Sequence, residues 1–163
     1  MRAVVQRASR ASVAVDGAVV GALDAPGLAV LVGAAVGDGP DDVAQVVRKV
    51  AELRILRGEV SAVDAGAPVL VVSQFTLLAD TRRGRRPSWS GAARAEEAEP
   101  LVDAVVAGLR ARGLRVATGV FGADMALEVV NDGPVTVLLD TARGQHQRRD
   151  RPPGHGPRTA PAP

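Results

Sequence analysis

Two segments far apart in this chain of 163 residues each join an apolar run to polar side chains and a tight turn. Residues 73–77, Ser-Gln-Phe-Thr-Leu, directly follow the apolar run 69–72. Residues 131–136, Asn-Asp-Gly-Pro-Val-Thr, separate the apolar stretches 126–130 and 137–139. Short apolar runs bounded by turn residues predict β-strands, so both segments are expected at the ends of strands in a sheet. There they would present backbone and hydroxyl groups to a ligand.

Strand and turn patterns continue along the chain, and two stretches instead repeat apolar residues at helical spacing. The first helix begins near Asp41 and runs for about four turns. The second runs from about Ala95 to Arg112, and Gly113 ends it. Proline is compatible only with the first turn of a helix, so Pro100 leaves a later start open as the alternative. The predicted strands are 2–9, 12–15, 18–23, 28–36, 69–72, 115–118, 126–131 and 135–140.

The expected fold class is α/β of the α+β kind, with two main helices on a mixed, mostly antiparallel sheet. The length and the 47% hydrophobic content suit one domain with its own core. We interpret residues 1–141 as this domain and residues 142–163, rich in Pro, Gly and Arg, as a disordered tail. No apolar stretch approaches the ~20 residues of a membrane-spanning helix, so we expect no membrane partner and a cytoplasmic location.

The basic excess of the chain lies in its tail. Residues 1–140 hold 15 Arg and Lys against 17 Asp and Glu, a net charge of −2, while residues 141–163 hold 5 Arg against one Asp, a net charge of +4. A basic tail would attract RNA phosphates weakly, and the simpler interpretation is a dispensable extension.

The residue types present exclude several kinds of catalysis. Cysteine is absent, and the only histidines, His146 and His155, lie in the tail. A general base has to be held rigidly near its proton, so a Ser-His-Asp triad, a Cys-His pair and a His-rich zinc site are disfavoured. The glycines of residues 33–40 lack the Lys-Ser/Thr ending of a phosphate-binding loop. Hydroxyls, amides, arginines, carboxylates and the backbone remain, and we expect neither a metal ion nor a cofactor.

Over residues 1–140 the chain resembles the D-aminoacyl-tRNA deacylase family. The resemblance implies an enzyme that hydrolyses the ester between a D-amino acid and tRNA, a step of chiral proofreading. It also implies a barrel-like closure of the sheet, a homodimer with active sites at the subunit interface, and aminoacyl-tRNA rather than DNA as the partner. The segments that carry the resemblance, in this order, are residues 1–13, 73–77, 85–88, 118–125 and 131–136.

The resemblance places the 3′ adenosine and the ester of the substrate against residues 73–77, with Ser73 and Gln74 as substrate contacts. Two ways of cleaving the ester stay open. Either the N–H groups around Phe75 and Thr76 stabilise the oxyanion while a ribose hydroxyl of the substrate assists, or the Thr76 hydroxyl is the nucleophile. From composition alone, this segment is a strand end with Phe75 in the core and hydroxyls that cap backbone groups. Phe121 and Met125 match a segment near the adenosine pocket and suit a core position equally well.

Gly133 and Pro134 alone would indicate a hairpin turn. The resemblance implies instead a cis peptide bond whose two carbonyl groups enter the partner subunit's active site and bind the α-ammonium of the substrate. The side chain of an L-residue would then collide with this loop, so L-residues are excluded sterically and glycyl-tRNA is an expected second substrate. Arg7 would brace the loop; a surface arginine in an alternating strand is the alternative.

Four arginines form the densest positive patch before the tail, and we expect them to contact tRNA phosphates, which position a ligand without specifying it. A solvated loop is the alternative. These residues are Arg82, Arg83, Arg85 and Arg86.

Residues 57–67 form a shorter hairpin than in relatives and are expected to touch neither main motif. The rival functions are a noncatalytic tRNA-binding homodimer and an editing domain for another aminoacyl ester, similar to that of archaeal threonyl-tRNA synthetase.

Overall fold

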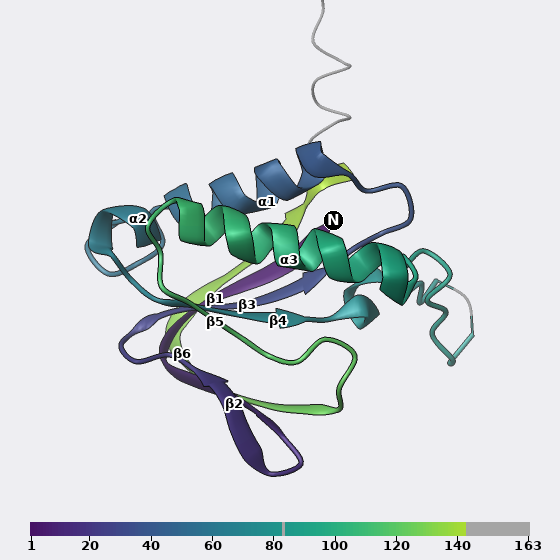
Figure 1. Cartoon of the computed structure of the whole chain (residues 1–163), viewed down its shortest axis with the longest axis horizontal. Coiled ribbons are helices and arrows are strands. Elements are labelled where there is room, and N and C mark those ends of the chain that lie inside the picture. Colours follow the sequence, from purple (N-terminus) through teal and green to yellow (C-terminus); the bar gives the residue numbers. More distant parts are fainter. Residues whose placement is uncertain (83, 143–163) are drawn as a thin grey trace, which may run out of the picture.

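The computed structural model describes residues 1–82 and 84–142. Their strands form one six-stranded sheet in the order β2-β1-β3-β4-β5 (Figure 1). β2 and β3 pair with different parts of β1, and β6 pairs with β1 along nearly its whole length. β1 is antiparallel to β2, β3 and β6, while β3, β4 and β5 run parallel. The predicted mixed, mostly antiparallel sheet is therefore confirmed. The strands are β1 Arg2–Val15, β2 Ala18–Ala22, β3 Gly27–Gly33, β4 Val69–Ser73, β5 Val116–Thr118 and β6 Met125–Asp140.

The sheet curls until its two ends approach each other. β1 pairs with β3 through its first half and with β2 through its last residues, so β2 continues the edge at which β3 ends. A Cβ atom at Gly21 of β2 would lie 2.3 Å from the carbonyl oxygen of Thr118 in β5. Only glycine fits this contact between the terminal strands, and the sheet is nearly closed into a barrel, as the resemblance implies.

Two long helices lie side by side on one face of the sheet (Figure 1). They are α1, Pro40–Glu52, and α3, Ala95–Ala111. In α1 the Asp42 carboxylate accepts from the Gly39 N–H at 3.0 Å, which caps the first turn. The helices approach closely because a Cβ at Gly108 of α3 would lie 2.8 Å from a methyl group of Val47. The main core lies between these helices and the sheet.

The second helix begins near Ala95 as its spacing predicts, and the later start that Pro100 suggested is wrong. α3 begins at Ala95, so Pro100 lies in its second turn rather than its first. Both Pro100 and Glu96, four residues before it, are exposed, so the carbonyl group that proline leaves without an amide partner faces water. Two short helical segments, α2 at Ala62–Ala65 and η1 at Phe75–Leu78, were not predicted.

The segment around Gly133 is not a hairpin turn. β6 continues through it, and both halves of β6 pair with β1. Gln6 lies opposite Thr136 and Ala8 lies opposite Asn131, so residues 132–135 face Arg7 alone. These residues therefore bulge out of the ladder, and the peptide bond between Gly133 and Pro134 is cis.

Candidate active site

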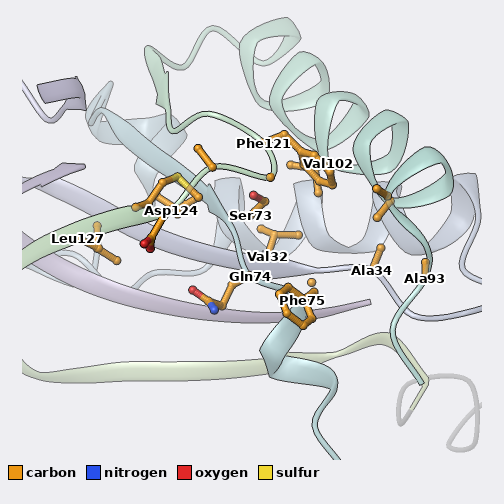
Figure 2. A pocket seen from close by; sticks show the side chains of 17 residues that line it. Val32, Ala34, Ser73, Gln74, Phe75, Ala93, Val102, Phe121, Asp124 and Leu127 are labelled. Carbon is orange, nitrogen blue, oxygen red and sulfur yellow. The ribbon is translucent and has the colours of Figure 1, made fainter. Parts of the chain in front are cut away.

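A cavity of about 390 Å³ opens at the carboxyl end of β4, beside η1 and the start of α3. Figure 2 shows the side chains of Ser73, Phe121 and Val102 directed into it. Five predicted substrate-site residues line this one cavity, so the structure brings them together from two distant parts of the sequence. They are Ser73, Gln74, Phe75, Phe121 and Met125.

The floor of the cavity is the end of a buried strand. Val69–Val72 of β4 are buried, as expected for a parallel strand covered on both faces. The Gln74 N–H then donates to the Val32 carbonyl at 2.7 Å, and the chain turns into η1. A Cβ at Gly33 would lie 2.6 Å from the Gln74 carbonyl oxygen, so glycine is required where β3 passes this turn.

The amides of Phe75 and Thr76 begin η1, where the first N–H groups of a helical turn have no acceptor within the turn. The Thr76 hydroxyl oxygen accepts a hydrogen bond from the side-chain amide of Gln74 at 2.5 Å. Thr76 is not among the residues that line the cavity. Its hydroxyl is therefore held by a donor, whereas a nucleophile needs a neighbouring base that accepts its proton.

Phe75 is not a core residue. Its side chain is 58% exposed, and its ring meets Trp89 edge to face with the centroids 5.9 Å apart. Such a pair contributes about 1 kcal/mol beyond the buried area. Phe75 lines the cavity and Trp89 packs against it, so the two rings form an apolar rim.

Sequence reasoning missed one wall of the cavity. The segment before α3 and its first turns contribute small side chains, which leave room for a ligand, and the alanine-rich sequence 92–98 was the available signal. Asp124 was also missed; it is the carboxylate among the lining residues, and Figure 2 shows it on the same side of the cavity as Gln74. The wall residues from this segment are Ala93, Ala95, Ala98 and Val102.

Arg7 and the Gly133–Pro134 loop do not line this cavity. Arg7 donates to the carbonyls of Asp132 at 2.9 Å and Gly133 at 3.3 Å, and also to the carbonyl of Ile55 at 3.2 Å. Arg7 lies opposite Leu28, which in turn lies opposite Val69 at the start of β4, whereas Ser73 ends β4. The loop and the cavity are thus separated by roughly 13 Å along the strands, at about 3.3 Å per residue.

The short segment 57–67 does touch a main motif, contrary to the expectation from sequence. The Arg57 guanidinium binds the Asp132 carboxylate through both oxygens, directly beside Gly133. The expectation failed because Arg57 and Asp132 lie 75 residues apart in sequence, and only the packing of residues 54–60 against β1 and β6 joins them.

The predicted phosphate contacts are not equivalent. Arg82 donates three hydrogen bonds to the Asp80 carboxylate, which holds the pKa of that carboxyl well below its usual range and raises the pKa of Arg82. Arg85 and Arg86 are exposed beside it. Arg83, both histidines and the predicted tail beyond Ala142 lie outside the described residues.

An open, largely apolar cavity that also presents the Ser73 hydroxyl, the Gln74 amide and the Asp124 carboxylate suits a hydrolase that acts on an already activated ester. Comparison with known proteins agrees with this class. The family model described as D-Tyr-tRNA(Tyr) deacylase matches residues 4–140. The D-aminoacyl-tRNA deacylase of Kineococcus radiotolerans is 66% identical over 140 residues, which is 86% of this chain and 99% of that protein.

Two solved structures have the same fold. A c-Myc DNA unwinding element binding protein superposes with a TM-score of 0.79 at 36% identity, over 86% of this chain and 98% of the other. A probable eukaryotic D-amino acid tRNA deacylase superposes with a TM-score of 0.71 at 16% identity, over 85% and 97% of the two chains.

The chain therefore belongs to the D-Tyr-tRNA(Tyr) deacylase family. It is an enzyme, a hydrolase with D-aminoacyl-tRNA deacylase activity. Within residues 1–82 and 84–142, no helix has the length and apolar character needed to span a membrane.

Proposed function

We propose that the enzyme proofreads the chirality of aminoacyl-tRNA with a site built from two subunits. The 3′ end of the substrate lies in the cavity at Ser73 and Gln74, and the Gly133–Pro134 loop of the partner subunit closes it. The observation that carries this proposal is the separation of cavity and loop within one chain. The loop is held in place by several hydrogen bonds but lies far from the cavity of its own chain. It can contribute to a substrate site if it enters the cavity of a second copy.

The outer face of β1 and β6 supports a second copy as the partner. Leu138 is 77% exposed on this face, and Val130 is 39% exposed on the same strand. Gln6 donates to the Thr136 hydroxyl at 3.1 Å and keeps the polar groups between them paired. Exposed apolar side chains on the outer face of a sheet favour burial against the same face of another molecule.

Ester cleavage in this proposal needs little from side chains. The N–H groups at the start of η1 stabilise the oxyanion, each worth about 3 kcal/mol, and the vicinal ribose hydroxyl of the substrate assists. The hydrogen bond from Gln74 to Thr76 supports this alternative over attack by the hydroxyl. Thr76→Ala should therefore keep kcat within about tenfold of the wild type. A loss of several orders of magnitude in a folded variant would make Thr76 the nucleophile.

Chirality is read by the loop. A carbonyl oxygen has two lone pairs, so the Gly133 carbonyl accepts from Arg7 and retains capacity for the α-ammonium of the substrate. With ammonium and ester both held, an L side chain collides with Pro134 and a D side chain does not. Glycine has no side chain to exclude, so glycyl-tRNA is a second substrate.

The tRNA body is held by charge. Arg85 and Arg86 contact phosphates and place the acceptor end, while Arg82 is occupied by Asp80. We place the enzyme in the cytoplasm, where its charged tRNA substrates are made.

The first test compares hydrolysis of D-tyrosyl-tRNA and L-tyrosyl-tRNA by the full chain and by residues 1–142. Rapid loss of the D-ester with the L-ester intact is expected for both proteins. Equal hydrolysis of the two esters would refute chiral proofreading, and hydrolysis of neither by folded protein would point to another aminoacyl ester.

A second test asks whether loop and cavity come from different subunits. Ala95→Trp fills the cavity with a large ring, whereas Arg7→Ala releases the loop. Arg7→Ala subunits are mixed with an excess of Ala95→Trp subunits. In each mixed dimer the open cavity of the Arg7→Ala subunit meets the intact loop of the Ala95→Trp subunit, so we expect the L-ester to be rejected again. If both elements belonged to one subunit, the mixture would stay unselective.

A further inference from the structure

The Asp132 carboxylate next to Gly133 is shared by two arginines that approach from different elements. Arg57 binds it through both oxygens, with Nε at 2.9 Å from one of them. Arg7 of β1 places its Nε 3.1 Å from the same oxygen while donating to the Asp132 carbonyl. The Arg7 side chain is 13% exposed and the Arg57 side chain 75% exposed, so the carboxylate has one inner and one outer partner.

Arg57 is presented by a tight turn. Leu56 and Val60 form an antiparallel bridge, and the Glu59 N–H closes the turn onto the Leu56 carbonyl at 3.1 Å. Gly58 and Glu59 adopt positive φ angles of 77° and 54°. Arg54 adds a hydrogen bond to the Glu59 carbonyl at 2.5 Å. The backbone under Arg57 is therefore fixed, and the planar guanidinium loses less side-chain entropy per hydrogen bond when it binds a carboxylate at two points.

The same turn segment also supports Arg7, since the Ile55 carbonyl accepts from the Arg7 guanidinium at 3.2 Å. Residues 55–57 thus contact the loop region twice, once through the arginine that binds the loop carbonyls and once through Asp132. Removing Arg57 leaves Asp132 paired with Arg7, so the fold retains its inner anchor. What is lost is the outer restraint on the peptide that precedes Gly133.

We propose that Arg57 is a positioning residue for chiral selection, acting through Asp132 to fix the direction of the Gly133–Pro134 loop. This inference rests on the proposed function, in which that loop excludes L-residues. Arg7 binds the loop carbonyls and Arg57 binds the Asp132 carboxylate, so together they restrain the loop against the movement that would admit an L side chain. Loosening one side widens the filter without touching the groups that cleave the ester.

The experiment measures kcat/KM for D-tyrosyl-tRNA and L-tyrosyl-tRNA with Arg57→Ala and Arg57→Lys. We expect hydrolysis of the L-ester relative to the D-ester to rise about threefold in Arg57→Ala, in line with an exposed two-point ion pair, and less in Arg57→Lys. The matched control is Arg10→Ala, which removes another exposed ion pair to β6, Arg10–Glu128, with 2.8 Å between the Arg10 nitrogen and the Glu128 oxygen. Its ratio should stay at the wild-type value.

Two further readouts separate positioning from a merely structural role. Because exposed charges are screened by salt, the selectivity of the wild type should fall as ionic strength rises, and that of Arg57→Ala should fall less. The ratio of two esters on one tRNA cancels the effect of salt on tRNA binding. In an Asp132→Asn background Arg57→Ala should add nothing, since both act on the same contact.

Failure of this inference and failure of the proposed function give different results. A selective wild type whose D-to-L ratio is unchanged by Arg57→Ala overturns the role of Arg57 alone. A wild type that does not discriminate the two esters overturns the loop filter and this inference with it. A fall in both rates together with a lower Tm, at constant ratio, assigns Arg57 to stability and also overturns the proposal.

Discussion

The cavity floor at residues 73–77 and the loop at residues 132–135 are held in place by different forces. The floor continues a buried parallel strand, and its position follows from backbone hydrogen bonds and from the close passage of Gly33. The loop leaves its strand ladder and is held by side chains, above all Arg7. Main-chain geometry thus fixes the proposed cleavage site, whereas side-chain hydrogen bonds fix the proposed selectivity filter.

This difference indicates that rate and selectivity respond to different substitutions. A change that moves the floor should lower hydrolysis of every ester, because the oxyanion amides move with it. A change that releases the loop should admit L-esters while D-esters are still cleaved. The following predictions test that separation, from the largest expected effect to the smallest.

Arg7→Ala should have the largest effect. It removes three hydrogen bonds to carbonyl groups and the partly buried ion pair with Asp132, which we expect to cost about 3 kcal/mol of stability. The preference for the D-ester should fall by tenfold or more, equivalent to about 1.4 kcal/mol. Arg7→Lys keeps the charge but not the forked geometry, so its preference for the D-ester and its stability should lie between those of the wild type and Arg7→Ala. Kinetics with both esters and chemical denaturation measure these effects; an unchanged ratio in Arg7→Ala would remove the distinction between the two regions.

Gly33→Ala should act on the other region. Its methyl group would lie 2.6 Å from the Gln74 carbonyl oxygen and from a methyl group of Leu78, so the floor has to shift. We expect a stability loss of about 1–3 kcal/mol and a fall in kcat/KM for the D-ester, with the D-to-L ratio preserved. Gly91→Ala is the control, since its Cβ would meet only the Leu78 carbonyl, at 3.8 Å. Full activity in Gly33→Ala would show that the floor tolerates displacement.

Acid should have the smallest effect and should spare both regions. Burial alone would raise the pKa of Asp42, but hydrogen bonds from Thr141 and Gly39 and the Met1 ammonium outweigh it and lower the pKa below the usual 3.8. A carboxyl with a lowered folded pKa contributes stability above its unfolded pKa and loses it as the pH falls through the folded value. The free energy of unfolding should therefore decline below about pH 4, and less steeply in Asp42→Asn. A change in the D-to-L ratio while the protein is still folded would contradict this assignment.

Much of the fold follows from local pattern. The spacing of Val43, Val46 and Val50 predicts α1, and the structure buries these residues in the core. The run 69–72 predicts a buried strand, which is β4. The spacing also predicts the start of α3 at Ala95, and the later start that Pro100 suggested was wrong because the carbonyl group that proline leaves without an amide partner faces water. The turn residues at Gly133 alone suited a hairpin as well as a bulge, and only pairing with β1 distinguishes the two. The cis peptide bond that the resemblance implied is present.

The residues of the site were predictable in part. Ser73, Gln74, Phe75, Phe121 and Met125, to which the resemblance pointed, line one cavity, whereas Thr76 does not line it. Asp124 and the alanine wall were missed, because small side chains and a lone carboxylate carry no motif of their own. The contact between Arg57 and the loop was not predicted, since its partner Asp132 is distant in sequence.

By itself the sequence determined the two long helices, most of the strand positions and the chemistry available, because periodicity and residue type act over a few neighbouring residues. It excluded histidine and cysteine catalysis from residues 1–141 and indicated a site that relies on the backbone. Only the tertiary structure decided that the cavity and the Gly133 loop lie apart on one chain, and that Arg7 and Arg57 share Asp132. Those outcomes depend on strand register and on contacts between distant segments, which are set by packing of the whole chain rather than by any local stretch of it.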